Sequence, residues 1–192
     1  AVKVGGAWQR EVADADGYVG MYTSLALQSI HGTAAPCISY FDYSHGRLKY
    51  ACKDGAGFWS TQVVDETAVV GLYTSLAIDA AGLAHISYYD ATNGDLRYAT
   101  RSTKGTWRWE TVDSAGNVGQ HTSLRLDADG HPHIAYYDAT NRHLKYARSD
   151  GRGWTVETAD AVDGAGQYAS LALDSEGRAH IAYYDSVLRD LK

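Results

Sequence analysis

The amino-acid sequence repeats itself four times at intervals of about 48 residues, and this repetition limits the fold more than any other feature. The first landmark of each repeat is an aromatic residue two positions ahead of a Ser-Leu pair, at Tyr22, Tyr73, His121 and Tyr168. The second is an apolar run that ends in aspartate, at Asp42, Asp90, Asp138 and Asp185. The third is a tryptophan, at Trp8, Trp59, Trp107 and Trp154, always 14 residues before the aromatic residue (8 to 22, 59 to 73, 107 to 121, 154 to 168). The sequence therefore predicts a single domain over residues 1–192, with repeats at approximately 1–50, 51–98, 99–146 and 147–192.

Each repeat contains four short apolar runs separated by Gly, Asp and Asn, which is typical of four β-strands. In the third repeat these runs are TSLRLD, HIAYYD, HLKYARS and WTVETAD. The DATNG and DATNR segments between the second and third runs are typical of hairpin turns. Because both faces of the first two strands are apolar, each sheet needs a neighbouring sheet on either side. We therefore predict an all-β fold, a β-propeller of four four-stranded blades.

The two ends of the chain correspond to parts of one repeat. Counting back from Trp8 places Ala1 level with Ala147, while Leu191 and Lys192 match residues 144 and 145. We predict that the N- and C-terminal segments together complete one blade and close the ring. Two alternatives remain: the chain is part of a longer array of repeats, or several subunits close a larger ring.

The charge pattern disfavours two classes of partner. The net charge is −6 and the sequence has no run of Lys and Arg, so neither nucleic acid nor an anionic membrane surface is expected as a partner. No segment approaches the roughly 18 consecutive apolar residues that a membrane-spanning helix needs. We therefore expect no membrane insertion.

The blade layout resembles that of sialidase-like propellers, whose Asp-box turn has the pattern Ser-x-Asp-x-Gly-x-Thr-Trp. The matching residues are Ser149, Asp150, Gly151, Gly153 and Trp154, then Asp54, Gly55, Gly57 and Trp59, and in degenerate form Ser102, Gly105 and Trp107. The resemblance covers the whole chain and implies the propeller fold, with these turns on the face away from an active site. It does not extend to the arginine triad, Tyr/Glu pair and acid of sialidases, because Arg125 is the one arginine in any first strand.

The candidate ligand-binding residues are the repeated aromatic residues and aspartates, namely Tyr22, Tyr73, His121, Tyr168, Asp42, Asp90, Asp138 and Asp185. If the blades surround an axis, the aromatic rings lie around one opening, where they stack on sugar rings while the carboxylates accept hydrogen bonds from sugar hydroxyls. The alternative is that the aromatic residues pack between blades and the aspartates cap turns.

We predict a binding or adhesion module that is lectin-like, with carbohydrate as the expected ligand class. The alternatives are a glycan-active hydrolase or lyase of sialidase-like layout, and a scaffold or protein-interaction propeller without catalysis. The sequence has no GxSxG, phosphate-binding loop, HExxH or CxxC motif, so we assign no catalytic residue and no cofactor and favour binding over catalysis. Features that break the repeat are the His121 substitution, Arg125 and a three-residue insertion in the segment QSIHGTAAP, which contains His31.

Three histidines, His85, His133 and His180, occupy equivalent positions in the repeats, with Cys37 in the fourth. Equivalent residues of different blades lie too far apart to share a zinc ion, whose ligand distances are about 2.0 to 2.3 Å. We therefore predict no metal site.

The two cysteines are expected to face each other. If Asp42 pairs with Arg47 in the second hairpin, paired positions sum to 89, and 37 plus 52 also gives 89. A disulfide between Cys37 and Cys52 would indicate an extracellular or cell-surface protein, while the alternative is a pair of buried free thiols.

Overall fold

The computed structural model describes residues 1–30 and 32–192, and these residues form β-strands joined by turns, without a helix. The described residues thus include no helix long and apolar enough to cross a membrane. The all-β prediction is confirmed. His31, singled out in the sequence, lies outside the described residues.

Most of the strands form four consecutive antiparallel sheets, which we call blades 1 to 4. Blade 1 contains β3 (Val19–Ile30), β4 (Thr33–Asp42), β5 (Arg47–Lys53) and β6 (Trp59–Asp65). Blade 2 contains β7 (Val70–Ile78), β8 (Ala84–Asp90), β9 (Asp95–Arg101) and β10 (Trp107–Asp113). Blade 3 contains β11 (Val118–Leu126), β12 (Pro132–Asp138), β13 (His143–Ser149) and β14 (Trp154–Asp160). Blade 4 contains three strands, β15 (Gln167–Leu173), β16 (Ala179–Asp185) and β17 (Asp190–Leu191).

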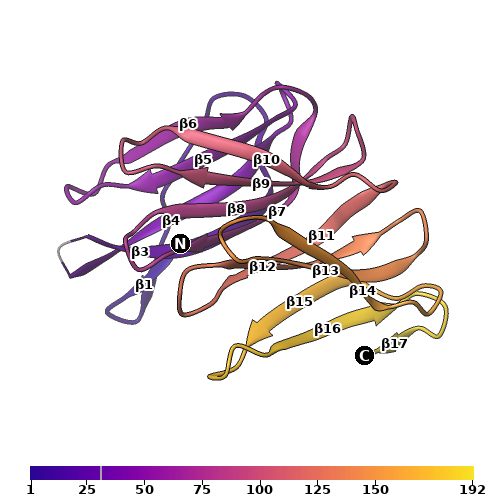
Figure 1. Cartoon of the computed structure of the whole chain (residues 1–192). Coiled ribbons are helices and arrows are strands. Elements are labelled where there is room, and N and C mark those ends of the chain that lie inside the picture. The colour runs from indigo at the N-terminus through magenta and orange to yellow at the C-terminus, as the bar shows by residue number, and fades with distance from the viewer. Residues whose placement is uncertain (31) are drawn as a thin grey trace.

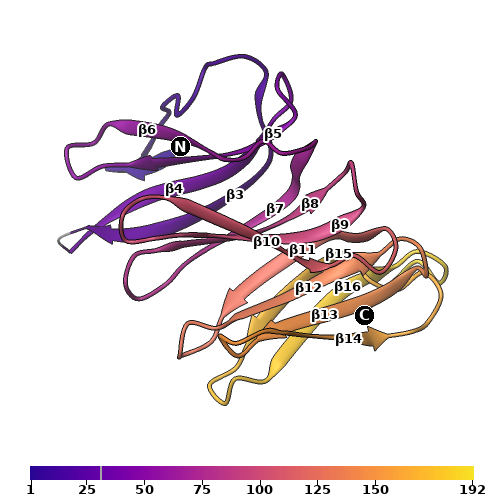
Figure 2. The ribbon, with the colours of Figure 1, turned by 45° about the horizontal axis from the view of Figure 1, so that its top comes forward.

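The blades follow one another in chain order along an arc, from the purple blade 1 to the yellow blade 4 (Figures 1 and 2). The first strands β3, β7, β11 and β15 adjoin one another at the inner side of this arc. Apolar side chains on both faces of the inner strands fill the spaces between blades, as the sequence predicted. For example, Leu124 of β11 is buried in one cluster with Tyr98 of blade 2.

Buried polar groups also join each of blades 1 to 3 to the segment that precedes it. In each case an aspartate accepts hydrogen bonds from a tyrosine hydroxyl of the next second strand and a cationic side chain of the next third strand. The sets are Asp14 with Tyr40 and Lys49, Asp65 with Tyr88 and Arg97, and Asp113 with Tyr136 and Lys145. A buried charge needs such a partner, so these sets fix how each blade sits on the one before it.

The N-terminal segment forms a separate hairpin of β1 (Val2–Val4) and β2 (Ala7–Gln9). It lies beside blade 1, whereas the C-terminus lies with blade 4 at the other end of the arc (Figures 1 and 2). Among the described residues no strand pairing joins this hairpin to β16 or β17. The predicted joining of the terminal segments into one blade is therefore not present in this structure.

The segment that carries the insertion in the first repeat is paired as a β-ladder over most of its length. It lengthens β3 and β4, with Gln28 paired to Ala35 and Ser29 paired to Ala34. The ladder satisfies backbone groups that a loop would leave to solvent. The Gln28 amide also donates a hydrogen bond to the carbonyl oxygen of Gly82 in blade 2, at 2.8 Å.

The Asp-box-like residues form the turns between third and fourth strands. The carboxylate of Asp54 accepts hydrogen bonds from the backbone N–H groups of Ala56 and Phe58 at 2.9 and 2.8 Å. Asp150 caps its own turn in the same way through Arg152 and Gly153. These aspartates therefore stabilise hairpin turns.

Cys37 and Cys52 are directly paired in the β4–β5 ladder and are joined as a disulfide in this structure. The cross-link closes a segment with a sequence separation of 15, for which loop entropy predicts a stabilisation of about 3 kcal/mol. We expect the Cys37→Ser, Cys52→Ser double variant to unfold at a lower urea concentration, with unfolding free energy lower by about that amount. Unfolding curves of wild type with and without reductant provide the comparison, and equal midpoints would contradict a disulfide in the purified protein.

Candidate functional site

The four repeated aromatic residues Tyr22, Tyr73, His121 and Tyr168 lie in one row across the inner strands, and we call this row the axial column. The ring centroids of neighbouring members are 4.8, 4.5 and 4.3 Å apart, in that order along the row. The planes are tilted by 50 to 55°. The structure thus brings each of the four predicted aromatic residues into contact with its neighbour in the row.

A local backbone distortion aims each ring at the column. All four residues have left-handed backbone conformations, with φ between 52 and 54°. In blade 2 the β7–β8 register shifts between Val70 and Leu72 and again between Leu72 and Ser75, which brackets Tyr73. Such β-bulges redirect side chains. The unfavourable φ of a non-glycine residue is maintained here because packing on both sides holds the strand in place.

The axial column borders a shallow cavity of about 230 Å³. Its lining combines the four rings with the small residue that follows each of them, Thr23, Thr74, Thr122 and Ala169. The Thr122 hydroxyl donates a hydrogen bond to the carbonyl oxygen of Tyr73 at 2.9 Å. The cavity is therefore lined by aromatic rings together with hydroxyl and methyl groups.

The protonation states in the axial column favour neutral side chains. Burial lowers the pKa of His121, so its imidazole is uncharged at neutral pH. Burial, and next the neighbouring Tyr22, raise the pKa of the Tyr73 hydroxyl. The column is consequently an uncharged aromatic surface with hydroxyl and imidazole groups along it.

The aromatic surface continues over blade 1 through residues that the sequence analysis did not single out. The Phe41 ring lies 6.4 Å from Tyr22 and 6.3 Å from Tyr43, and Tyr43 packs edge-on against Tyr18 at 5.5 Å. Tyr18 and Tyr43 are both largely exposed. The residues of repeats two and three that are equivalent to Tyr18 and Tyr43 are not aromatic. They are small or polar, with the one exception of Val69. This break in the repeat is the feature that would have identified them.

The four aspartates are not part of the exposed aromatic surface. Asp42, Asp90, Asp138 and Asp185 are buried at the ends of the second strands. Asp90 accepts hydrogen bonds from the backbone N–H groups of Thr92 and Asn93 and forms an ion pair with Arg97 at 2.7 Å. The aspartates cap the hairpins of their own blades, and in this structure their carboxylates are not open to a ligand.

The equivalent histidines occupy separate blades. His85 is hydrogen-bonded to Tyr98, and His133 is likewise bonded to Tyr146. Among the described residues, Asp127, Asp129 and His131 have ligand-type atoms within 4.8 Å of one another. There the Asp127 carboxylate accepts hydrogen bonds from the backbone N–H groups of the other two residues, so this group forms a turn cap.

No family model and no curated protein matches the sequence of this chain. Several solved structures match its fold. A mutant of AofleA from Arthrobotrys oligospora has a TM-score of 0.64 and 16% identity, with 88% of this chain and 52% of that chain covered. An exo-β-1,3-galactanase from Phanerochaete chrysosporium, solved with galactose, has a TM-score of 0.54 and 13% identity, with 100% and 52% covered. The β-1,3-galactosidase BT3683 has a TM-score of 0.54 and 11% identity, with 84% and 66% covered.

These similar structures are β-propeller proteins. The chain has a propeller-like fold. At these identities the likeness is one of fold and not of chemistry. The chain spans about half the length of AofleA and of the galactanase.

Proposed function

We propose that this protein is a carbohydrate-binding propeller that binds sugars at the aromatic surface formed by the axial column and blade 1. The observation that carries the proposal is the continuous set of rings from Tyr18 through Tyr43 and Phe41 to the column, several of them exposed. The apolar faces of sugar rings stack on such rings, and the Thr hydroxyls and His121 offer hydrogen bonds beside them. The names of the similar structures, among them one galactanase with bound galactose, agree with this ligand class.

Binding is better supported than hydrolysis at this place. Glycoside hydrolases generally use two carboxyl groups about 5 to 9.5 Å apart across the scissile bond. The lining of the axial cavity, within the described part of the chain, consists of Tyr, His, Thr and Ala. A hydrolase would need carboxylates from elsewhere on the same face, where Asp42 and its three equivalents are held in buried turns.

Two further points accompany the proposed function. Export to the cell surface or the medium remains a prediction, supported by the Cys37–Cys52 disulfide, which persists in oxidising compartments. A four-bladed ring closed by the chain's own terminal segments, which is not present in this structure, is the alternative to the association of two copies that we propose below. Its test is the oligomeric state, treated in the next section.

A glycan-array screen of the purified protein tests the proposal, with variants that remove single rings. We expect Tyr43→Ala and Tyr168→Asn to weaken the strongest sugar signal at least tenfold. A tenfold weaker affinity corresponds to a loss of about 1.4 kcal/mol of binding free energy, which we attribute to the missing stacking contact. Asparagine is chosen at position 168 because it tolerates the left-handed backbone there better than alanine.

Phe58→Ala is the matched control, because Phe58 is equally exposed but lies in a turn at the outer side of blade 1. Equal loss of binding in the control and in Tyr43→Ala would place the sugar elsewhere. No saturable binding to any glycan would argue for a scaffold or protein-binding role.

A further inference from the structure

Blade 1 has one face that packs on blade 2 and one that faces away from it. The face directed away from blade 2 is exposed, although the equivalent faces of the other blades are buried. Leu25 of β3 is 61% exposed, whereas the corresponding Leu76, Leu124 and Leu171 are buried against the blade before them. Ile38 is likewise partly exposed, while Ile86 and Ile134 are fully buried. We call this surface the leading face. Its side chains have the pattern of a blade interface but lack a blade to cover them.

The opposite face, on blade 4, is exposed in the complementary way. Leu191 is 83% exposed, although the equivalent residues 48, 96 and 144 are buried. Ala182 is exposed, while its equivalent Ala135 is buried in one cluster with Leu171 of the next blade. We call this surface of blade 4, formed by β15, β16 and β17, the trailing face. It has the pattern of a surface that receives the next leading face.

The leading and trailing faces carry residues equivalent to those that contact each other between successive blades. At Gly119 a Cβ atom would lie 2.7 Å from the Cα of Leu96, so the glycine makes room for the leucine of the preceding blade. At Gly20, in the leading face, a Cβ atom would meet nothing within 4 Å. A leucine equivalent to Leu96 is available on the trailing face, Leu191. The space at Gly20 therefore fits that residue.

A hydrogen bond between blades is also available to the two faces. The backbone N–H of Leu124 donates to the Ser75 hydroxyl at 3.0 Å, and Leu171 donates to Ser123 in the same way. The corresponding donor of the leading face is the N–H of Leu25, and the corresponding acceptor is Ser170, which is exposed in blade 4. A docked trailing face would satisfy both groups.

The N-terminal hairpin is built as the outer edge of a blade. Its register pairs Lys3 with Trp8, as β13 and β14 pair Ser149 with Trp154. Asp14, just after the hairpin, accepts hydrogen bonds from Tyr40 and Lys49 of blade 1. The last residue of the fourth strand plays this part in the later blades. Trp8 is 66% exposed, whereas the other three repeated tryptophans are partly buried.

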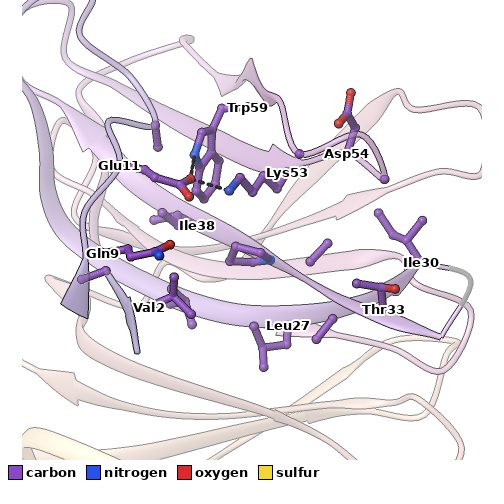
Figure 3. A pocket seen from close by; sticks show the side chains of 18 residues that line it. Val2, Gln9, Glu11, Leu27, Ile30, Thr33, Ile38, Lys53, Asp54 and Trp59 are labelled. Carbon is purple, nitrogen blue, oxygen red and sulfur yellow. Dashed lines mark hydrogen bonds and ion pairs between the residues drawn. The ribbon is translucent and has the colours of Figure 1, made fainter. Parts of the chain in front are cut away.

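A cavity of about 540 Å³ separates this hairpin from blade 1. Figure 3 shows that Val2 and Gln9 of the hairpin line this cavity together with Leu27 and Ile38 of blade 1. Between successive blades of the arc, the second and third strands of the earlier blade occupy the corresponding space. The cavity therefore fits the strands β16 and β17 of a trailing face.

We propose that two copies of this chain associate head to tail, with the trailing face of one copy inserted between the N-terminal hairpin and the leading face of the other. Within one copy the two faces lie at opposite ends of the arc (Figure 2). One chain spans about half of AofleA and of the galactanase, so two copies supply about the length of one such fold. The association continues the row of axial rings, because Tyr22 of one copy meets Tyr168 of the other. The proposal is independent of the ligand.

Light scattering coupled to size-exclusion chromatography tests the association over a range of protein concentrations. We expect wild type to have twice the mass of the chain, and Leu25→Arg to have the mass of one chain. Val69→Arg is the matched control, since it places the same charge on an exposed apolar side chain in the loop between β6 and β7, outside both faces, and it should keep the double mass. Circular dichroism checks that each variant is folded.

Alanine at position 20 is strained at the backbone φ of 96°, so Gly130→Ala, which has similar strain in a turn of blade 3, is the control for that effect. Gly20→Ala tests the same interface with a smaller change, because its Cβ atom meets nothing within 4 Å in one chain and overlaps Leu191 only in the assembly. We expect at least a tenfold higher dissociation constant for this variant. Mixing Leu25→Arg with Ala182→Arg should give a one-to-one heterodimer, since each variant retains the face that the other lacks.

Wild type with the mass of one chain at all concentrations would overturn the proposal and support closure within a single chain. A double mass that persists in both Leu25→Arg and Gly20→Ala would place the contact on another surface. A mixture of the two arginine variants that stays monomeric would rule out head-to-tail pairing.

Discussion

Gly119→Ala is expected to lower the free energy of unfolding by about 3 to 5 kcal/mol, which is a large part of the stability of an ordinary domain. Gly119 has a φ of 104°, a conformation that L residues rarely adopt. An added Cβ atom would also lie 2.7 Å from the Cα of Leu96 and 2.9 Å from its backbone nitrogen. Both of these atoms belong to the backbone of blade 2, so neither can move aside without displacing a strand.

Gly130→Ala separates the two causes. Gly130 has a φ of 83° in the turn between β11 and β12, and a Cβ atom there would meet nothing within 4 Å. We expect this control to lower the free energy of unfolding by about 1 to 2 kcal/mol, because only the backbone conformation opposes the alanine. Urea unfolding followed by tryptophan fluorescence, at one protein concentration, gives both values. Equal losses in the two variants would show that blades 2 and 3 do not approach as closely as described.

The repeat made most of the fold accessible from the sequence. Apolar residues on both faces of strands such as HIAYYD require sheets on either side, and this requirement leads to stacked blades whatever the detailed contacts. The position of the axial aromatic residues follows from the same pattern, because the first strand of every blade must meet its neighbours at the inner side. The pairing of Cys37 with Cys52 follows from hairpin register alone.

Other features depend on contacts between distant residues, which the sequence pattern does not contain. The left-handed backbone at Tyr73 arises from a bulge held in place by packing on both sides, and tyrosine itself has no preference for it. The burial of Asp90 depends on its ion pair with Arg97, which lies on the next strand of the blade. The aromatic surface of Tyr18 and Tyr43 depends on a contact between two loops of one blade.

Asp113→Ala is expected to lower the free energy of unfolding by about 3 to 5 kcal/mol, because it leaves a buried ammonium group without its counter-ion. The Asp113 carboxylate accepts hydrogen bonds from Lys145 and from the Tyr136 hydroxyl, the latter at 2.7 Å. All three residues are buried. In the described part of the chain Lys145 forms no ion pair with another carboxylate. Changing Lys145→Met in the same variant should restore much of the loss, since an apolar side chain needs no counter-ion there.

The same carboxylate makes stability depend on pH. Burial alone would raise the pKa of Asp113, but the hydrogen bonds from Lys145 and Tyr136 outweigh it and hold the pKa below the usual 3.8. A carboxyl group with a lowered folded-state pKa contributes its full stabilisation above its unfolded pKa and loses it as the pH falls through the folded value. Wild type should therefore lose stability below about pH 4 more steeply than the Asp113→Ala, Lys145→Met variant. Urea unfolding midpoints between pH 7 and pH 3 measure the difference, and parallel curves would show that this carboxylate has the same pKa in the folded and unfolded chain.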